Sequence, residues 1–294
     1  MFPQPTAKTA PIGLIIGCII FGLGSVIVAH VPVGAYAMAF WRLAVAGVIF
    51  WLLARYFGQT FPAQSAARRN ALLAGVFLGL DLALWHESIY AVGPGISTLL
   101  NSLQIFWLTA IGRLWFGERV TPFQAAGLVL AVAGVAMIGS PEFGQNGAAA
   151  WGFISGLVSG LMLALSMVFV RKTHQAAHTP IFPLMLHISL GGMAALLLPA
   201  LLLNGHNLLP QTWAQLGWII VYGAVMQCFA WGLIAYSIPL LSLSMTGLLL
   251  LSEPVAALLI DALLLGKPIN ALQWTGAVLT MLAIYLGSLK NKAA

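Results

Sequence analysis

The chain has 294 residues, of which 61% are hydrophobic and only 6% are charged. Soluble proteins are about 25% charged, and six acids with twelve bases cannot cover 31.2 kDa with a polar surface. The composition therefore excludes a water-soluble enzyme and predicts an all-α integral membrane protein with lipid as most of its solvent.

The net charge of +6 does not indicate a nucleic-acid partner. The basic residues lie in short gaps between apolar runs, where membrane topology explains them. Cys18 and Cys228 lie inside apolar runs and are interpreted as small packing residues, not as a disulfide or metal ligands. Lys8 followed by an apolar run resembles the start of a signal peptide. Because the hydrophobic pattern continues along the chain, we interpret this run as a retained transmembrane span.

A spanning helix needs about 20 mostly apolar residues. Proline, glycine, charge and Asn/Gln clusters divide the chain into ten segments of about this length. In chain order the expected transmembrane helices are 11–30, 33–57, 70–90, 95–115, 121–140, 150–171, 180–203, 211–236, 241–265 and 270–288. The stretch 211–265 is divided at Ser237–Pro239, since two helices fit its length and one does not.

With ten spans both termini lie on one side, and the distribution of basic residues identifies that side. The bases on the terminal side are Lys8, Arg55, Arg68, Arg69, Arg113, Arg119, Arg171, Lys172, Lys290 and Lys292. Only Lys267 falls on the opposite side, and Arg42 lies within a span. The bias predicts a multi-pass protein of a bacterial-type inner membrane with both termini in the cytoplasm.

Two segments of the chain resemble each other: GERVTPFQAAGLVLAVAGV (117–135) and GKPINALQWTGAVLTMLAI (266–284). At a constant offset of 149 residues the matching pairs are Gly117 with Gly266, Gln124 with Gln273, and Gly127 with Gly276. GLIIG (13–17) likewise resembles GFISG (152–156). We therefore expect two five-helix repeats, 11–140 and 150–288. Five is an odd number, so the second repeat should enter the membrane inverted.

Inverted repeats are typical of secondary transporters, which bind substrate near the midplane between the halves. Two similar units could also pack merely as a symmetric scaffold. The chain has no GxxxxGK[ST] nucleotide loop, because its Gly266-Lys267 pair precedes a proline and lacks the loop. Transport would therefore be secondary or facilitated, with no cofactor.

The fused five-helix units resemble the EamA family of the drug/metabolite transporter superfamily, over nearly the whole chain. In that family a Glu-Pro pair often marks the fourth helix of each unit. It is present here as Glu253-Pro254, whereas the first unit has Gln104-Ile105. Within the family the chain is most similar to aromatic amino-acid exporters of the YddG type. The resemblance implies export of aromatic or other neutral amino acids and related small metabolites by alternating access.

Ionisable residues inside spans cost roughly 2.5–3.5 kcal/mol at the bilayer centre and often mark a transport pathway. The expected substrate cavity is therefore lined by the polar and aromatic residues of the spans. These candidates are Trp41, Arg42, Asp81, Trp85, His86, Glu87, Tyr90, Gln104, Trp107, His187, Gln227 and Glu253. Asp261 lies beside Lys267 and is expected to form a surface ion pair instead.

The stretch GLDLALWHESIY (79–90) carries five of these candidates. At helical spacing Asp81 and Trp85 share one face, while His86 and Tyr90 share another with Glu87 at its edge. This helix should have no broad lipid-facing side, and it either lines a cavity or makes buried polar contacts. HESIY lacks the second histidine of the zinc motif, so no metal is expected.

Arg42 cannot lose its proton and must be paired or hydrated. Its partner could be Glu87, Asp81 or a substrate carboxylate, and a purely structural ion pair is equally open. Pro254 removes a backbone donor beside Glu253, which could free a carbonyl for substrate, let the helix bend, or only kink it.

Other function classes are weaker. An integral-membrane enzyme needs a nucleophile, a metal or an acid/base pair, and the sequence contains no complete set. A channel is disfavoured, since the halves lack a ring of repeated polar residues. A multidrug or cationic-compound exporter of the same superfamily is the main alternative. A bundle of this size in one chain favours a monomer.

Overall fold

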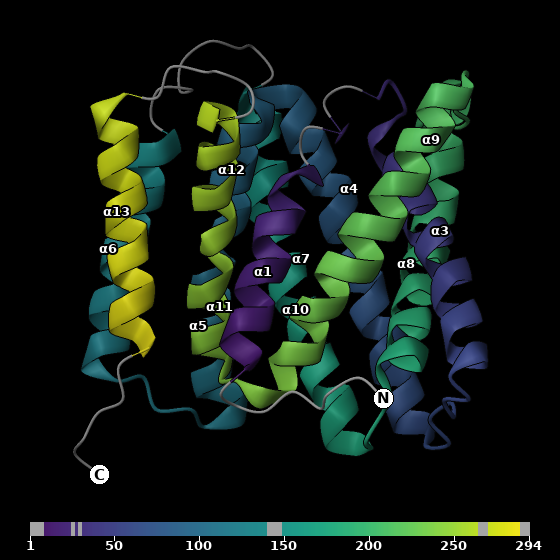
Figure 1. Ribbon diagram of the computed structural model, residues 1–294, viewed down its shortest axis with the longest axis horizontal. Helices are drawn as coiled ribbons and strands as arrows, with labels where there is room; N and C mark the ends of the chain where they lie inside the picture. The colour runs from purple at the N-terminus through teal and green to yellow at the C-terminus, as the bar shows by residue number, and fades with distance from the viewer. Residues whose placement is uncertain (1–8, 25–26, 29–30, 140–148, 264–269, 289–294) are drawn as a thin grey trace.

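The computed structural model describes residues 9–24, 27–28, 31–139, 149–263 and 270–288. In these ranges the chain forms helices and no β-strand, and the helices stand side by side in one bundle (Figure 1). The first half contains α1 (Ala10–Gly22), α3 (Ala35–Tyr56), α4 (Ser65–Ser102), α5 (Gln104–Phe116) and α6 (Pro122–Gly139). The second half contains α7 (Ala149–Ala176), α8 (Ile181–Leu203), η2 (Gly205–Asn207), α9 (Trp213–Val221), η3 (Tyr222–Ala230), α10 (Trp231–Ser237), η4 (Ile238–Leu240), α11 (Leu243–Leu250), α12 (Ser252–Leu263) and α13 (Ala271–Ser288).

Five helical segments of the described chain are long and apolar enough to cross a membrane. They are Ala35–Tyr56, Ser65–Val92, Ala150–Ala176, Ile181–Leu203 and Trp213–Leu240. Shorter apolar helices occupy Ala10–Gly22, Pro122–Gly134, Leu243–Ala256 and Ala271–Leu286. The protein is thus a multi-pass membrane protein, and described helices fall in each of the ten predicted segments. The stretch 95–115 is divided between the end of α4 and α5, and it is not among the apolar segments above.

The third and fourth predicted spans, 70–90 and 95–115, are not separated by a loop as expected. Instead, α4 continues as a helix from the first span into the second. In a straight helix, Asp81 and Asn101 would lie about 30 Å apart. Instead Asn101 Nδ2 donates to Asp81 Oδ1 at 2.8 Å, and Ser97 Oγ donates to the Trp85 carbonyl at 3.1 Å. The helix therefore doubles back near the predicted boundary, where the sequence has a proline between two glycines.

The ninth predicted span, 241–265, is not one continuous helix. It breaks at Leu251 between α11 and α12, just as the first half breaks at Leu103 between α4 and α5. At each break the backbone N–H bonds three residues back, at 3.2 Å, in place of the helical bond four residues back. Pro254 explains the second break, because it cannot donate to the helix before it. The two breaks fall within one residue of the same repeat position.

The glutamines matched in the repeat have a shared structural cause. Gln124 Oε1 accepts from the Thr121 N–H at 3.0 Å, and Thr121 Oγ1 accepts from the Gln124 N–H at 3.1 Å. Asn270 and Gln273 make the same reciprocal pair, at 3.1 and 2.9 Å. Each pair caps the start of an 18-residue helix, α6 or α13, by satisfying backbone donors that have no helical partner.

Helices at equivalent repeat positions pack on each other in opposite directions. The start of α3 meets the end of α8, where the Tyr36 N–H donates to Asn204 Oδ1 at 2.9 Å. At the other end the Phe182 N–H donates to Gln59 Oε1 at 3.1 Å. The last helices of the two halves, α6 and α13, also pack closely (Figure 1), and α4 packs on α7.

Close helix approaches occur at the small-residue positions of the sequence. A Cβ on Gly79 of α4 would lie 2.9 Å from Gly192 Cα of α8, and one on Gly160 of α7 would lie 2.8 Å from the Asn101 carbonyl oxygen. These glycines therefore let the helices pack closely. Cys18 and Cys228 are both free, which also agrees with their interpretation as packing residues.

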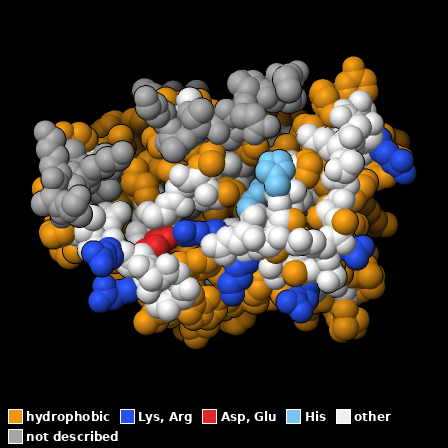
Figure 2. Space-filling view, turned by 90° about the horizontal axis from the view of Figure 1, so that it is seen from below, with side chains coloured by type: hydrophobic (Ala, Val, Ile, Leu, Met, Phe, Trp, Pro, Cys, Tyr) orange, Lys and Arg blue, Asp and Glu red, His pale blue; other side chains and the backbone are white. Residues whose placement is uncertain are grey.

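Basic side chains gather at the lower end of the bundle, and apolar side chains surround it (Figure 2). The helix ends there carry Arg55, Arg68, Arg69, Arg113, Arg119, Arg171 and Lys172. Lys8, Lys267, Lys290 and Lys292, which also enter the topology prediction, lie outside the described residues, as does the side chain of Asp261. The described charges alone thus give the bundle one strongly basic end.

Candidate functional site

The centre of the site is Arg42 of α3, whose side chain is fully buried. Its Nε donates to Gln227 Oε1 at 2.8 Å, and its Nη1 donates to the Tyr222 hydroxyl at 2.8 Å. The guanidinium carbon lies 4.6 Å from the ring centroids of both Phe21 and Tyr222. Cation–π attraction is worth about 2 kcal/mol at a desolvated site, so the two rings partly offset the cost of burying this charge.

Neither acid suggested by the sequence, Glu87 or Asp81, forms an ion pair with Arg42; in the described part of the chain, only Arg171 and Glu118 make one. Asp81 of α4 and Glu253 of α12 are buried and act on Arg42 electrostatically from a greater distance. The guanidinium is therefore held by neutral partners, with two buried carboxyl groups in the wider surroundings.

His86 connects this cluster to the start of α3 at the upper end of the bundle. Its Nδ1 lies 3.1 Å from the Ala35 carbonyl oxygen, and its Nε2 lies 2.9 Å from the Tyr222 hydroxyl. A carbonyl can only accept, so Nδ1 must carry the proton that it donates. The neutral ring then accepts from Tyr222, whose oxygen in turn accepts from Arg42. Three buried side chains thus form one directed hydrogen-bond chain.

Gln227 and Tyr222 lie on a π-helix, η3, which interrupts the eighth predicted span. Such wider turns are rare and frequently occur at functional sites. Small residues let η3 approach the first half of the chain: a Cβ on Gly223 would lie 3.0 Å from the Arg42 carbonyl oxygen. The second half therefore presents its polar side chains directly to α3.

A second polar group joins α4 to α7. Asn101 Nδ2 donates both to Asp81 Oδ1 at 2.8 Å and to Ser159 Oγ at 3.0 Å. Gln104 is also buried, at the start of α5, and its backbone lies beside Gly160 of α7. These bonds hold Asp81 in place, and no basic side chain in the described part of the chain forms an ion pair with it.

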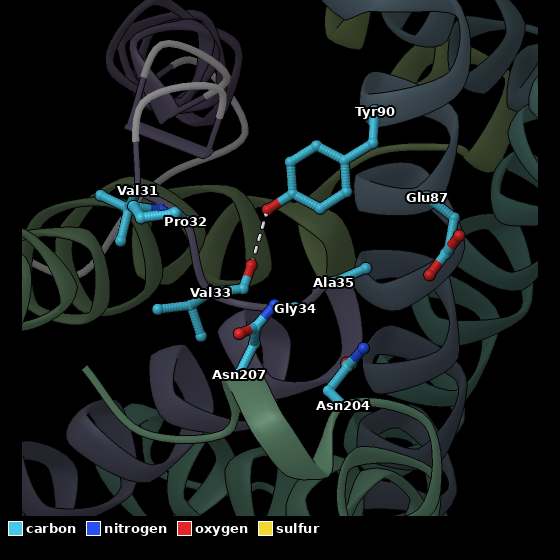
Figure 3. Close-up of a pocket in the computed structure, with 9 residues that line it drawn as sticks. All are labelled: Val31, Pro32, Val33, Gly34, Ala35, Glu87, Tyr90, Asn204 and Asn207. Atoms are coloured by element: carbon cyan, nitrogen blue, oxygen red, sulfur yellow. Dashed lines mark hydrogen bonds between the residues drawn. The ribbon is translucent and has the colours of Figure 1, made fainter. Parts of the chain in front are cut away.

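A cavity of about 330 Å³ (Figure 3) lies where α3 begins and α8 ends, which is the upper end of the bundle in Figure 1. It is lined by Val31, Pro32, Val33, Gly34, Ala35, Glu87, Tyr90, Asn204 and Asn207. Tyr90 donates to the Val33 carbonyl at 2.9 Å, and Glu87 accepts from Trp151 Nε1 at 3.1 Å. Ala35 both lines this cavity and bonds His86, so the cavity adjoins the buried cluster.

The remaining sequence candidates lie apart from Arg42 or at its margin. Trp85 is buried with its ring centroid 6.2 Å from that of Phe21, and half-buried Trp41 donates to the Leu208 carbonyl at 2.7 Å. His187 bonds the Pro183 carbonyl of its own helix at 2.7 Å. Trp107 is 44% exposed. The last two are not brought to the cluster.

Sequence reasoning missed Tyr222 and Phe21 as members of the site, and it left Trp231 out of the expected cavity. Tyr222, Gln227 and Trp231 are spaced five and four residues apart in an otherwise apolar run, which was the available signal. The α-helical period would not have placed the first two on one face, and the π-helix does.

A different contact closes the lower end of the bundle. Glu118, which follows α5, pairs with Arg171 at the end of α7 and accepts from the Leu243 N–H of α11 at 3.1 Å. The Arg171 guanidinium carbon lies 4.5 Å from the Phe116 ring centroid. The Glu118 side chain thus connects the end of α5 to the end of α7 and the start of α11, which belong to different halves of the chain.

The described chain is thus an apolar helical bundle of a membrane protein, and its buried polar residues come from both halves. Both halves match the model of the EamA-like transporter family, at residues 8–140 and 150–289, and the chain belongs to this family. It is 27% identical to a probable amino-acid metabolite efflux pump of Salmonella typhimurium and 25% identical to one of Escherichia coli K12, over 91% of each chain. A crystal structure with 15% identity superposes with a TM-score of 0.74 over 96% of both chains and shares the fold.

Proposed function

We propose that this protein is a secondary transporter that exports amino acids, aromatic or other neutral, and related small metabolites across the inner membrane. The observation that carries the proposal is the similarity, over 91% of both chains, to two relatives named as probable amino-acid metabolite efflux pumps. The site supports it, because a buried cation and two buried carboxyl groups can bind the two ends of a zwitterion.

The proposed architecture is ten transmembrane helices in two inverted repeats, 11–140 and 150–288. The opposite directions of α3 and α8, which are equivalent helices, support the inversion. Basic residues at the lower end support a cytoplasmic location for that end and for both termini (Figure 2). The protein would act as a monomer, in lipid, on a small-molecule substrate.

Transport would proceed by alternating access around the Arg42 cluster. The upper cavity adjoins the cluster, while the Glu118–Arg171 pair joins the two halves at the lower end. This arrangement supports a conformation that faces outward. Opening of the lower end would require that ion pair to separate, and the helix breaks at Leu103 and Leu251 provide symmetric points for bending.

Purified protein in liposomes tests the function. We expect saturable uptake of radiolabelled L-phenylalanine or L-leucine that is accelerated by unlabelled amino acid on the other side. Arg42→Ala and Glu253→Ala should reduce uptake more than they reduce membrane insertion. A non-saturating current would indicate a channel. Uptake of ethidium without amino-acid uptake would favour the cationic-compound exporter, which buried Asp81 and Glu253 would suit.

A further inference from the structure

Three hydrogen-bond donors in the site have no acceptor. Arg42 Nη2, Gln227 Nε2 and Trp231 Nε1 are buried and lack a partner in the described part of the chain. The three side chains are 0%, 0% and 1% exposed. A buried donor left unpaired costs about 1–3 kcal/mol, and more when it is charged. Three in one region indicate a missing acceptor.

The three donors belong to one neighbourhood. Arg42 and Gln227 are joined directly, through Nε and Oε1 at 2.8 Å. Gln227 and Trp231 are four residues apart in consecutive helical segments, so their side chains lie on one face. Trp231 and Arg42 also share Phe21, whose centroid lies 6.1 Å from the Trp231 ring and 4.6 Å from the guanidinium carbon.

We propose that Arg42 Nη2, Gln227 Nε2 and Trp231 Nε1 bind the carboxylate of the transported molecule. The proposal rests on the proposed function and specifies which part of the substrate is recognised, and by which atoms. Nε and Nη1 of Arg42 are already used, so Nη2 would bind one carboxylate oxygen while Gln227 and Trp231 supply donors for the other.

A carboxylate fits this environment better than a neutral group. All three unpaired groups are donors, and one of them carries a permanent positive charge that no carboxyl group in the described ranges contacts. A substrate amide would bring an NH₂ group toward donors and no negative charge. The buried carboxyl groups of Asp81 and Glu253 lie in the wider surroundings of Arg42 and would accept hydrogen bonds from the ammonium group of the same molecule.

A ligand series with matched side chains tests the recognition. Binding to the detergent-purified wild-type protein is measured by shift of its thermal unfolding midpoint and by isothermal titration. The ligands are L-phenylalanine, 3-phenylpropionate, L-phenylalaninamide and 2-phenylethylamine. We expect the amide and the amine to bind about 10- to 100-fold more weakly than L-phenylalanine, since a charge-assisted contact is lost. 3-Phenylpropionate should still shift the midpoint.

The variant Gln227→Glu gives the sharpest test, because it keeps the shape of the side chain and places a carboxylate among the donors. We expect an unfolding midpoint equal to or above that of the wild type, since Arg42 gains a counter-ion. L-Phenylalanine should bind at least 10-fold more weakly, while 2-phenylethylamine should not lose affinity. Trp231→Phe, which removes one donor, should show a smaller loss. Arg55→Gln, an exposed change on α3, the helix that carries Arg42, is the control.

The outcomes separate this inference from the function itself. If amino acids are transported but L-phenylalaninamide binds as tightly as L-phenylalanine, the carboxylate assignment is wrong and the function stands. Wild-type affinity in Gln227→Glu would also overturn it. If no amino acid is transported, the proposed function fails. The carboxylate site is then still tested by whether 3-phenylpropionate shifts the unfolding midpoint of the wild type and whether that shift is lost in Gln227→Glu.

Discussion

At the scale of single residues, the structure turns isolated polar positions into one connected group. Arg42, His86 and Gln227 were recognisable in the sequence because ionisable and amide side chains are costly in an apolar span. Their partner Tyr222 was not, since tyrosine is common in membrane helices. It lies 180 residues from Arg42 and 136 from His86, and only the fold brings the three together.

The variant Tyr222→Phe tests how much the hydrogen bonds of the Tyr222 hydroxyl contribute to stability. The change removes the one hydroxyl that accepts from Arg42 and donates to His86, and it preserves the ring beside the guanidinium. We expect a loss of about 1–3 kcal/mol in stability, because two buried groups lose a partner. The measurement is thermal unfolding in detergent, with Tyr56→Phe at an 84% exposed position as control. An unchanged midpoint would show that water replaces the hydroxyl.

At the scale of helices, the internal repeat is clearest at the N-termini of α6 and α13, which are capped in the same way. The sequence showed matching glutamines but gave no reason for them. The structure shows that each closes a reciprocal bond with the residue three positions earlier, Thr121 or Asn270. Helix ends leave backbone donors unsatisfied, so the same local problem has the same solution in both halves.

Thr121→Ala and Asn270→Ala should therefore behave alike. Each removes a capping acceptor, and each is expected to lower stability by about 0.5–2 kcal/mol. Thermal unfolding of the two single variants and the double variant checks this. The effects should add, since the two caps belong to different helices. Opposite signs for the two substitutions would contradict a shared capping role.

Helix packing at Gly79 allows a second test at this scale. Gly79→Ala would place a Cβ 2.9 Å from Gly192 Cα, backbone that cannot move without separating α4 from α8. We expect a lower unfolding midpoint and less protein in the membrane. Gly217→Ala is the matched control, because no atom lies within 4 Å of its Cβ and helix propensity there favours alanine by up to about 1 kcal/mol. Equal midpoints for the two variants would rule out a packing role.

At the scale of the whole molecule, the two ends of the bundle differ. The upper end has a cavity next to His86 and Ala35, and the lower end is tied by Glu118 to Arg171 and Leu243. A transporter that alternates between two openings must break such a tie in one half of its cycle. The ion pair should thus set the balance between the two conformations.

Glu118→Gln tests this balance. A cysteine at position 90, Tyr90→Cys in a background without the native cysteines, reports opening of the upper cavity to a membrane-impermeant maleimide. We expect Glu118→Gln to slow labelling several-fold, since weakening the lower tie favours the conformation that opens there. Arg113→Gln, which removes an exposed charge at the same end, should leave the rate unchanged. Faster labelling would place the ion pair in the other conformation.

The sequence by itself determined that this chain lies in a membrane, where nearly all of its helices lie, and that part of the chain is repeated. These features follow from local composition and from spacing along the chain. It also identified Arg42, Asp81, His86, Gln227 and Glu253 as unusual. Only the tertiary structure decided which of them meet, that His187 and Trp107 stand apart, and that Arg42 has neutral partners. Contacts between segments more than 100 residues apart depend on how helices pack, and the doubled-back α4 and the π-helix change that packing in ways that no helical period predicts.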